Sequence, residues 1–188
     1  MCAGLVQIPY AAIVPARTGD RNATQFKHIR LKGYQVSNEE ALQQLLEERA
    51  IERVMADYAY YLDMNMPEQM ADLFVDDCEV DYAPNFGAKG KDAYKKTLDG
   101  IGSFFRGTSH HNSRPVIDWV SPTEVNTRTI LVAIHRYTKD RPDGILYGQY
   151  FDTLVKDNGQ WKFKKRVLKT TMTTDYHVKA GNEIGRNP

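Results

Sequence analysis

Two adjacent histidines, His110 and His111, stand in the stretch TSHHNSRPVIDW, which is typical of a β-strand. Imidazole has a pKa of about 6.5, so a positioned histidine can take up a proton and return it near neutral pH. Successive side chains of a strand leave on opposite faces, so at most one of the two histidines points into an interior. The alternation alone leaves open which one does.

Two further polar residues stand out from the local pattern. Asp63 falls in the last turn of a predicted helix, where a carboxylate meets the negative end of the helix dipole at a cost of about 0.3–1 kcal/mol. Such violations cluster at functional sites, although a solvated Asp near a helix end is the simpler interpretation. His135 lies in the strand-like run TRTILVAIHRYT, on a face of rather small residues. A lone histidine there is more often a core residue than a catalyst.

Three more polar side chains could belong either to the folded protein's ordinary structure or to a functional site. Tyr58 lies on the apolar stripe of the predicted helix, and Tyr82 on a short predicted strand. Both are expected in the core, yet a buried phenol needs a hydrogen-bond partner and can supply one to a substrate carbonyl. Arg166 shares an alternate strand face with Lys162 and Lys164, which predicts a solvated basic face.

The first element that would position these residues is a long helix beginning at Ser37. Ser37 and Glu40 form the S-x-x-E capping box that precedes an amphipathic helix. The helix is expected to end between Asp63 and Asn65, and its apolar residues recur at spacings of three and four: Leu42, Leu45, Leu46, Ile51, Val54, Met55, Tyr58, Tyr61 and Leu62. Asn65 and Pro67 are then expected as the cap and first turn of a second helix, PEQMADLF.

The second half of the chain is rich in β-type sequence. A third helix is expected over residues 90–105, after a short strand at 78–83. Four long runs follow, separated by SPT, KDRPDG and KDNG, which are turn sequences of antiparallel neighbours: 109–120, 124–138, 145–156 and 160–172. Helices first and a meander afterwards indicate an α+β fold, in which a long sheet curls around the helix and leaves a pocket between them.

Composition limits the class of protein. With 188 residues, and 25 Lys plus Arg against 24 Asp plus Glu, the chain suits one domain with no charge excess to attract nucleic acid or an anionic membrane. Its two cysteines, Cys2 and Cys78, form no CxxC pair, which argues against a disulfide scaffold or a structural zinc site. No apolar run reaches the roughly 20 residues of a membrane helix. We therefore expect a cytoplasmic protein with an arm at 1–36, a domain at 37–175 and a tail at 176–188.

From Leu46 to about Thr173 the sequence resembles the SnoaL-like and scytalone dehydratase-like members of the NTF2-like superfamily. Three stretches carry the resemblance: AIERVMADYAYYLD, then HHNSRPVIDWVSPTEV with a further histidine in HRYTKD, and the closing DNGQWKFKKR. The resemblance implies a cone-shaped, cystatin-like α+β fold. In it, N-terminal helices pack into a strongly curved, mixed but mostly antiparallel sheet around a deep pocket.

The resemblance also implies roles for individual residues. In scytalone dehydratase-like enzymes two histidines, a helix-end Asp and a strand tyrosine surround the substrate, and these match His110, His135, Asp63 and Tyr82. Bile acid dehydratases place a tyrosine five residues before the Asp, which matches Tyr58. The implied chemistry is acid-base catalysis, in which Asp63 orients His110 and no metal or organic cofactor takes part.

Substrate contacts are less well defined by the resemblance. Lindane dehydrochlorinase has an arginine that matches Arg166, whereas scytalone dehydratase has a tyrosine in place of Leu62 and an asparagine in place of Tyr150, so the particular substrate stays open. Tyr150, Phe105 and Arg166 are the expected substrate-binding residues. The candidate aromatic wall of the pocket comprises Phe104, Phe105, Tyr147, Tyr150 and Phe151. Such a wall suits a flat hydrophobic ring system of the polyketide, steroid or terpenoid type.

The expected function is therefore a dehydratase acting on a cyclic hydroxyketone. Three alternatives stay open at this stage: an isomerase or cyclase that uses the same base, a non-catalytic module similar to the small subunit of ring-hydroxylating dioxygenases, and a metal site. In the last, His110, His135 and Asp63 would form the two-histidine, one-carboxylate set of non-haem iron centres. Because this superfamily commonly forms dimers or trimers through the outer sheet face, we also expect a homo-oligomer.

Overall fold

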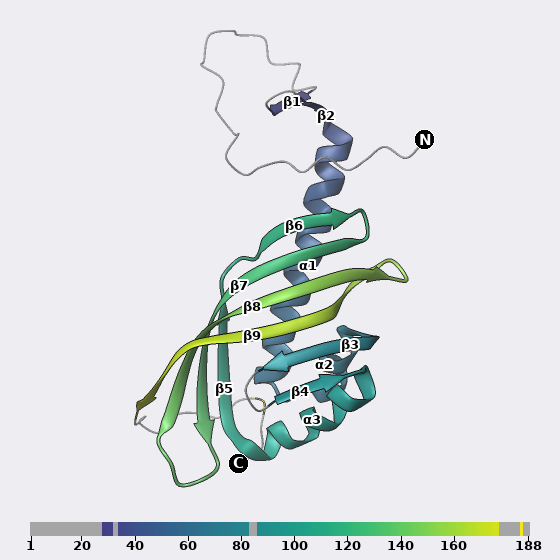
Figure 1. Ribbon diagram of the computed structural model, residues 1–188. Coiled ribbons are helices and arrows are strands. Elements are labelled where there is room, and N and C mark those ends of the chain that lie inside the picture. Colours follow the sequence, from purple (N-terminus) through teal and green to yellow (C-terminus); the bar gives the residue numbers. More distant parts are fainter. Residues whose placement is uncertain (1–27, 32–33, 83–85, 177–184, 186–188) are drawn as a thin grey trace. The chain divides into compact units, whose positions relative to one another are not determined.

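The computed structural model describes residues 28–31, 34–82, 86–176 and 185, in two compact units, Met1–Ala50 and Ile51–Pro188. The first unit contains a two-stranded antiparallel sheet, β1 (His28–Leu31) with β2 (Tyr34–Ser37), and the beginning of helix α1 (Asn38–Asp63). The second unit contains the end of α1 and every other element (Figure 1). Most of the predicted arm and tail lies outside the described residues.

Helix α1 begins and ends where the sequence predicts. The backbone N–H of Glu40 donates to Ser37 Oγ at 3.1 Å, and the N–H of Ser37 donates to Glu40 Oε2 at 2.9 Å, which is the complete capping box. The predicted stripe is buried only in its second half, at Ile51, Val54, Met55, Tyr58 and Leu62. Burial along the whole stripe was a wrong expectation, because Leu42, Leu45 and Leu46 are more than half exposed. Periodicity shows which residues share a face, and not what that face packs against.

The link between α1 and helix α2 (Pro67–Asp72) differs from the prediction in one respect. Pro67 opens α2 as expected, but Met66 occupies the N-cap position and makes no side-chain capping bond. Asn65, predicted as that cap, instead has a φ of 55° and donates its N–H to the carbonyl of Leu62 at 3.2 Å. Asn tolerates the left-handed conformation better than most residues, so Asn65 terminates α1 rather than starting α2.

A seven-stranded sheet follows α2. Its strand order is β4-β3-β9-β8-β7-β5, with β6 paired to β7. All pairs are antiparallel except β3 with β9, so the sheet is mixed and mostly antiparallel, and the predicted α+β fold is confirmed. The remaining elements are β3 (Phe74–Tyr82), β4 (Phe86–Lys89), α3 (Lys91–Phe104), β5 (Phe105–Asn112), β6 (Val116–Ser121), β7 (Glu124–Tyr137), β8 (Asp143–Asp157) and β9 (Gln160–Tyr176).

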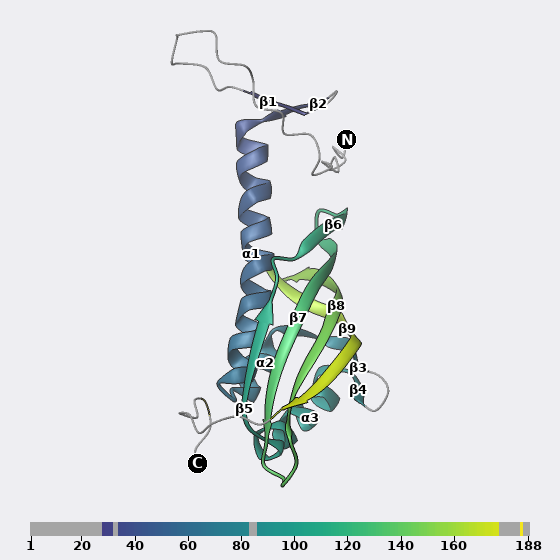
Figure 2. The same cartoon turned by 90° about the vertical axis from the view of Figure 1, so that its left-hand side faces the viewer.

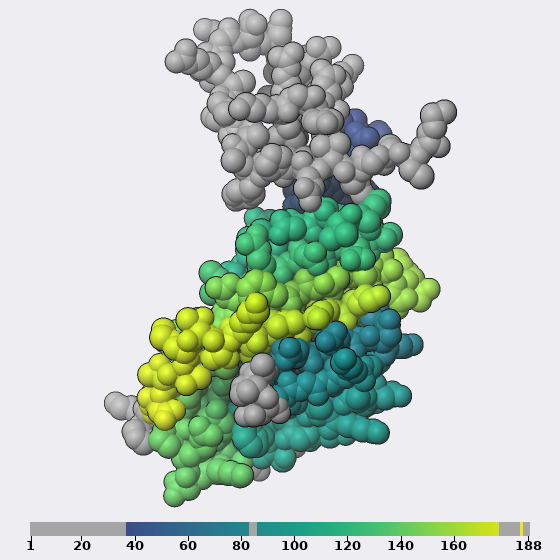
Figure 3. Space-filling model, in the orientation of Figure 1, coloured from purple at the N-terminus to yellow at the C-terminus, as the bar shows by residue number. Residues whose placement is uncertain are grey.

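The long strands carry the curvature of the sheet, and two details of their prediction were wrong. The run 109–120 is divided into β5 and β6 by residues 113–115, and β4 had no counterpart in the prediction. β8 and β9 meet through a two-residue turn at Asn158 and Gly159, both at positive φ, as an Asn-Gly hairpin requires. In the space-filling view β9 crosses the visible face between β8 and β3 (Figure 3).

The core lies between the inner face of this sheet and the helices. On β7, Val125, Thr127, Thr129, Leu131 and Ala133 are buried and alternate with exposed or half-buried neighbours. This strict alternation is the sign of a strand with one covered face. The end of α1 runs beside β5 (Figure 2). Helices α2 and α3 lie near the end of the sheet that this part of α1 reaches (Figure 2). The side chains that face this enclosed volume are the ones available to a site.

A β-bulge on β9 overturns the prediction for Arg166. Thr153 on β8 pairs with Lys165, but the next residue, Leu154, pairs with Phe163, so Lys164 is an extra residue without a partner on β8. An extra residue reverses which face the following side chains occupy. Arg166 therefore points inward and is fully buried instead of joining Lys164 on the solvated face.

Candidate active site

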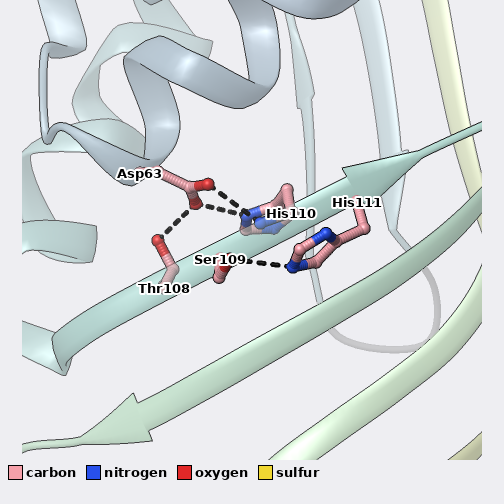
Figure 4. A network of polar contacts seen from close by, with 5 residues as sticks. All are labelled: Asp63, Thr108, Ser109, His110 and His111. Carbon is pink, nitrogen blue, oxygen red and sulfur yellow. Dashed lines mark hydrogen bonds and ion pairs between the residues drawn. The ribbon is translucent and has the colours of Figure 1, made fainter. Parts of the chain in front are cut away.

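Asp63 and His110 meet where the end of α1 passes β5. His110 Nδ1 lies 2.7 Å from Asp63 Oδ1, and the backbone N–H of His110 donates to Asp63 Oδ2 at 2.9 Å. The hydroxyl of Thr108 donates to Oδ1 at 2.8 Å. The carboxylate is thus held by three bonds to one strand (Figure 4). The position of Asp63 in the last turn of α1, unfavourable for the helix, is what allows this contact.

These contacts fix which nitrogen of His110 carries the proton. Burial raises the pKa of Asp63, but the hydrogen bonds and charge of His110 and the hydrogen bond of Thr108 outweigh it and hold that pKa below its ordinary value. The carboxylate is therefore ionised at neutral pH and accepts a hydrogen bond from Nδ1–H. Nε2 is then the basic nitrogen, which is the arrangement of an imidazole oriented by a carboxylate.

The neighbouring histidine points the other way. His111 is exposed, and its Nε2 lies 3.0 Å from the hydroxyl of Ser109 on the opposite face of β5 (Figure 4). The side chain of His110 is only 5% exposed. The two histidines lie near the end of β5, which begins at Phe105, and the structure places His110 at the interior and His111 at the surface.

The interior next to His110 is a cavity of about 450 Å³. Apart from Thr97 of α3, the polar side chains that line it fall into two groups: Thr108, His110 and His135 from β5 and β7, and Tyr58, Tyr82, Tyr94 and Tyr150 from four other elements. Most of the remaining wall is apolar, with Leu62, Leu131, Leu168 and Phe86 among its residues. A cavity of this size, apolar with a few convergent polar groups, is typical of a small-molecule site.

His135 stands beside His110 in a row of rings. The centroids of the two imidazoles are 5.6 Å apart, edge to face, and Phe105 stacks on His135 at 4.8 Å. His135 pairs with Thr108 across β5 and β7, and His110 with Ala133. The site therefore has one imidazole held by a carboxylate and a second held between aromatic rings.

The tyrosines form a second polar group. The hydroxyls of Tyr58 and Tyr82 are 2.5 Å apart, and Tyr94 donates to the Tyr58 oxygen at 3.5 Å. Tyr58 is 1% exposed and Tyr94 is fully buried. Burial, together with the neighbouring phenols, raises the pKa of Tyr82 and Tyr94 well above the ordinary value, so these phenols stay protonated and act as donors.

Several expectations about the pocket wall need correction. Phe104, Phe105 and Tyr150 line the cavity, as expected, but Tyr147 and Phe151 do not. They alternate along β8 with the buried Gly148 and Tyr150 and so occupy the outer face. Arg166, expected to bind substrate, is also absent from the lining, because its guanidinium lies behind the rings of Tyr58 and Tyr150.

Sequence reasoning missed three contributors to the site. Thr108 bonds the catalytic candidate Asp63, Tyr94 extends the tyrosine group, and Asp152 lies beside Arg166 with a 3.7 Å separation between Oδ1 and Nε. Asp152 shares one face of β8 with Tyr150 and Leu154, and a carboxylate in the middle of that apolar face is the sequence signal that could have found it. Thr108 and Tyr94 carry no comparable signal.

The described residues also bear on two other classes of function, metal binding and membrane insertion. Within them, no group of three or more His, Cys, Asp or Glu side chains is arranged to hold a metal ion. His110, His135 and Asp63 therefore do not converge as an iron-type set there. None of the helices in the described part of the chain is long and apolar enough to cross a membrane.

Comparison with known proteins agrees with this architecture. A family model described as the SnoaL-like domain matches residues 43–167. A solved protein from Novosphingobium aromaticivorans, described as a candidate scytalone dehydratase, is 71% identical, covers 79% of this chain and 99% of its own, and has a TM-score of 0.69. No curated protein sequence matches the chain.

Two more distant structures share the fold. A hexachlorocyclohexane dehydrochlorinase is 17% identical, covers 76% of this chain and 97% of its own, and has a TM-score of 0.70. A candidate aromatic ring hydroxylase from Novosphingobium aromaticivorans is 15% identical, covers 70% of this chain and 94% of its own, and has a TM-score of 0.65. At such identities the likeness extends to the fold alone.

Proposed function

The chain belongs to the SnoaL-like domain family, and from that premise and the geometry of its cavity we propose that it is a dehydratase that needs no cofactor. It removes water from a cyclic, hydrophobic hydroxyketone. The observation that carries the proposal is the Asp63–His110 pair, joined at 2.7 Å, in which the imidazole lines a cavity of about 450 Å³ and the carboxylate holds that imidazole from behind the cavity wall. An imidazole that is held in one orientation at the wall of an apolar cavity can act as a general base.

The proposed reaction uses the two polar groups of the cavity for different tasks. His110 Nε2 takes the proton from the carbon α to the substrate carbonyl, and the electron pair of that C–H bond moves into an enolate. Tyr82 or Tyr58 donates a hydrogen bond to the enolate oxygen, as an oxyanion-hole donor does.

Loss of the hydroxyl completes the elimination. The enolate collapses to form the new carbon–carbon double bond, and the β-hydroxyl leaves with its bonding electrons. His135, which enters the step as the imidazolium, gives that oxygen a proton, so that water departs and His135 is left neutral. His110 has gained a proton and His135 has lost one, and transfer between the neighbouring imidazoles or through solvent restores both. No metal or organic cofactor enters this balance.

The wall of the cavity supports a flat hydrophobic substrate. Phe86, Phe104, Phe105 and Tyr150 supply aromatic surface, and Gly100 and Ala133 leave room beside it. The 71% identical protein is described as a candidate scytalone dehydratase, so scytalone is the first compound to test. The resemblance matches Tyr150 to an asparagine of scytalone dehydratase, so a related cyclic ketone is the second choice.

The test is product formation from scytalone by the wild-type chain and by Asp63→Asn and His110→Gln. A dehydratase releases a product lighter by one water, and each substitution is expected to lower kcat by about 10²–10⁴-fold, the usual contribution of general acid-base catalysis. His111→Gln is the matched control, because it removes an imidazole from the outer face of the same strand. It should leave kcat unchanged.

Other outcomes identify the alternatives. A product of unchanged mass would mean an isomerase or cyclase that uses the same base. If the wild-type protein and His110→Gln both bind cyclic ketones and neither converts them, the protein is a non-catalytic module. Full activity in Asp63→Asn would contradict the proposal, because the oriented imidazole would then have no part in the chemistry.

A further inference from the structure

Arg166 is the largest fully buried side chain of the protein's described residues, and it is caged by aromatic rings. Its guanidinium carbon lies 3.6 Å from the ring centroid of Tyr150, 3.9 Å from that of Tyr58 and 4.5 Å from that of Phe163. Tyr58 and Tyr150 present their other surfaces to the cavity, whose wall they form. A cation thus stands directly behind two phenols of the candidate site.

Asp152 holds this cation in place. It is 3% exposed, and its Oδ1 approaches Arg166 Nε to 3.7 Å, which makes an ion pair but is longer than a hydrogen bond. Asp152 pairs with Arg166 on β9 and with Thr127 on β7, so the three side chains form one row across the inner face. Burying two charges costs several kcal/mol for each, and loosely paired charges recover only part of that cost. A pair of this kind is poorly explained by stability alone.

The phenols in front of Arg166 form a chain with one free end. Tyr94 donates to Tyr58, and if Tyr58 donates onward over its 2.5 Å contact, the hydroxyl hydrogen of Tyr82 is left to point to a ligand. Hydrogen bonds in such a chain polarise one another. A cation behind Tyr58 strengthens that polarisation, because it stabilises negative charge that shifts along the phenols.

We infer that Arg166, anchored by Asp152, is a positioning residue that acts through Tyr58 and Tyr150 to make the tyrosine end of the cavity selective for an anionic oxygen. The ligand class is a planar enolate or phenolate. The inference rests on the proposed function only in taking the enolate as the natural ligand. Arg166 does not touch the ligand and sets, through Tyr58, the strength with which the hydroxyl of Tyr82 holds its oxygen.

The experiment uses 4-nitrophenol, a planar probe whose ionised and neutral forms differ in their visible absorption. Titration of the probe bound to the full chain gives its pKa in the cavity, and 4-nitroanisole measures affinity for a neutral probe of similar shape. The wild-type protein is expected to lower the pKa of bound nitrophenol relative to the free probe. Arg166→Met should weaken nitrophenolate binding by about tenfold or more, equal to one pKa unit, and leave nitroanisole binding unchanged.

Two further variants separate electrostatics from packing. The double variant Arg166→Met with Asp152→Leu replaces the buried pair by apolar groups, a change that such sites often tolerate. It should melt near the wild-type temperature and still lack the preference for nitrophenolate. Lys164→Met removes a positive charge from the exposed side chain two residues away and should leave both probes unaffected.

The inference is overturned by a folded double variant that still lowers the pKa of bound nitrophenol, or by a wild-type protein that binds the neutral probe at least as tightly as nitrophenolate. Neither result depends on turnover. If the phenolate preference is present and scytalone and related ketones are not converted, the proposed function fails and the inference stands.

Discussion

The Asp63 carboxylate shows how one residue is held against its local preference. It sits at the unfavourable end of α1, and Thr108 and His110 offset that cost with three hydrogen bonds from β5. Charge-assisted bonds of this kind are stronger than neutral ones. The same bonds fix the tautomer of His110, so the feature that costs helix stability is also the one that prepares the base.

The lowered pKa of Asp63 predicts how stability depends on acid. The unfolded chain takes up a proton on this carboxyl at higher pH than the folded chain does, so its contribution is present above about pH 4 and is lost as pH falls below that value. Urea denaturation from pH 6 to pH 3 should show a smaller loss in Asp63→Asn than in the wild-type protein. Equal acid sensitivity of the two would mean that the bonds to β5 do not stabilise the ionised form.

Asp152 is expected to behave in the opposite sense. Burial raises its pKa to about 7, with Arg166 opposing the rise. Between about pH 4 and pH 7 the unfolded chain is then ionised at this position while the folded chain still holds its proton, and the ion pair with Arg166 is complete only above about pH 7, so the contribution to stability falls as pH rises, by at most about 1.4 kcal/mol per pH unit. The slope of unfolding free energy against pH in this window should be flatter in Asp152→Asn. A slope equal to the wild-type slope would contradict the raised pKa.

At the scale of elements, α3 offers a matched test of backbone and packing. Gly100 and Gly102 both lie inside α3, where glycine costs up to about 1 kcal/mol relative to alanine. A Cβ at position 100 would meet nothing within 4 Å, whereas a Cβ at position 102 would lie 2.8 Å from Asn65 Oδ1. Gly100→Ala should therefore raise the free energy of unfolding by about 0.5–1 kcal/mol.

Gly102→Ala should gain less than Gly100→Ala or lose stability, since Asn65 ends α1 in the left-handed conformation and its short side chain must move aside. Thermal and urea denaturation of both variants measure the difference. A larger gain at position 102 than at position 100 would show that the contact between α3 and the end of α1 is loose.

The elements also show where sequence patterns suffice and where they fail. Capping at Ser37, the end of α1 at Asp63 and the Asn158–Gly159 turn were all predicted, because each depends on residues close together in the chain. The position of Arg166 was not. A single extra residue at Lys164 reverses the faces of β9, and nothing in the local alternation announces it.

The candidate site follows the same division. The sequence predicts four site residues that line the cavity: His110, His135, Tyr58 and Tyr82. The resemblance to known dehydratases, rather than periodicity, selected His110 over His111. Thr108, Tyr94 and Asp152 were missed because their roles arise from contacts between elements far apart in sequence.

At the scale of the whole molecule, one curved sheet serves proteins of different chemistry. A dehydrochlorinase and a protein described as a candidate aromatic ring hydroxylase both share this fold, so the fold alone does not choose a reaction. The choice lies in which side chains point into the cavity and how much space they leave. The expected dimer or trimer stays a prediction that is independent of this choice.

The space in the cavity can be tested without touching its polar groups. Ala133 is 1% exposed, lines the cavity and pairs with His110 across β5 and β7. Ala133→Leu places a larger apolar side chain in that space, so it should keep or raise the melting temperature, since each buried methylene contributes about 0.8 kcal/mol. It should also weaken nitrophenol binding and conversion of scytalone by about tenfold or more, because the ligand and the leucine compete for one volume.

Val132→Leu is the control for that substitution, because Val132 pairs with His111 on the outer face of the same strand. It should change neither binding nor turnover. A protein with Ala133→Leu that melts as the wild type does and still binds nitrophenol with full affinity would place the ligand elsewhere. The pocket beside His110 would then not be the site at which the fold, the oriented imidazole and the tyrosine chain act together.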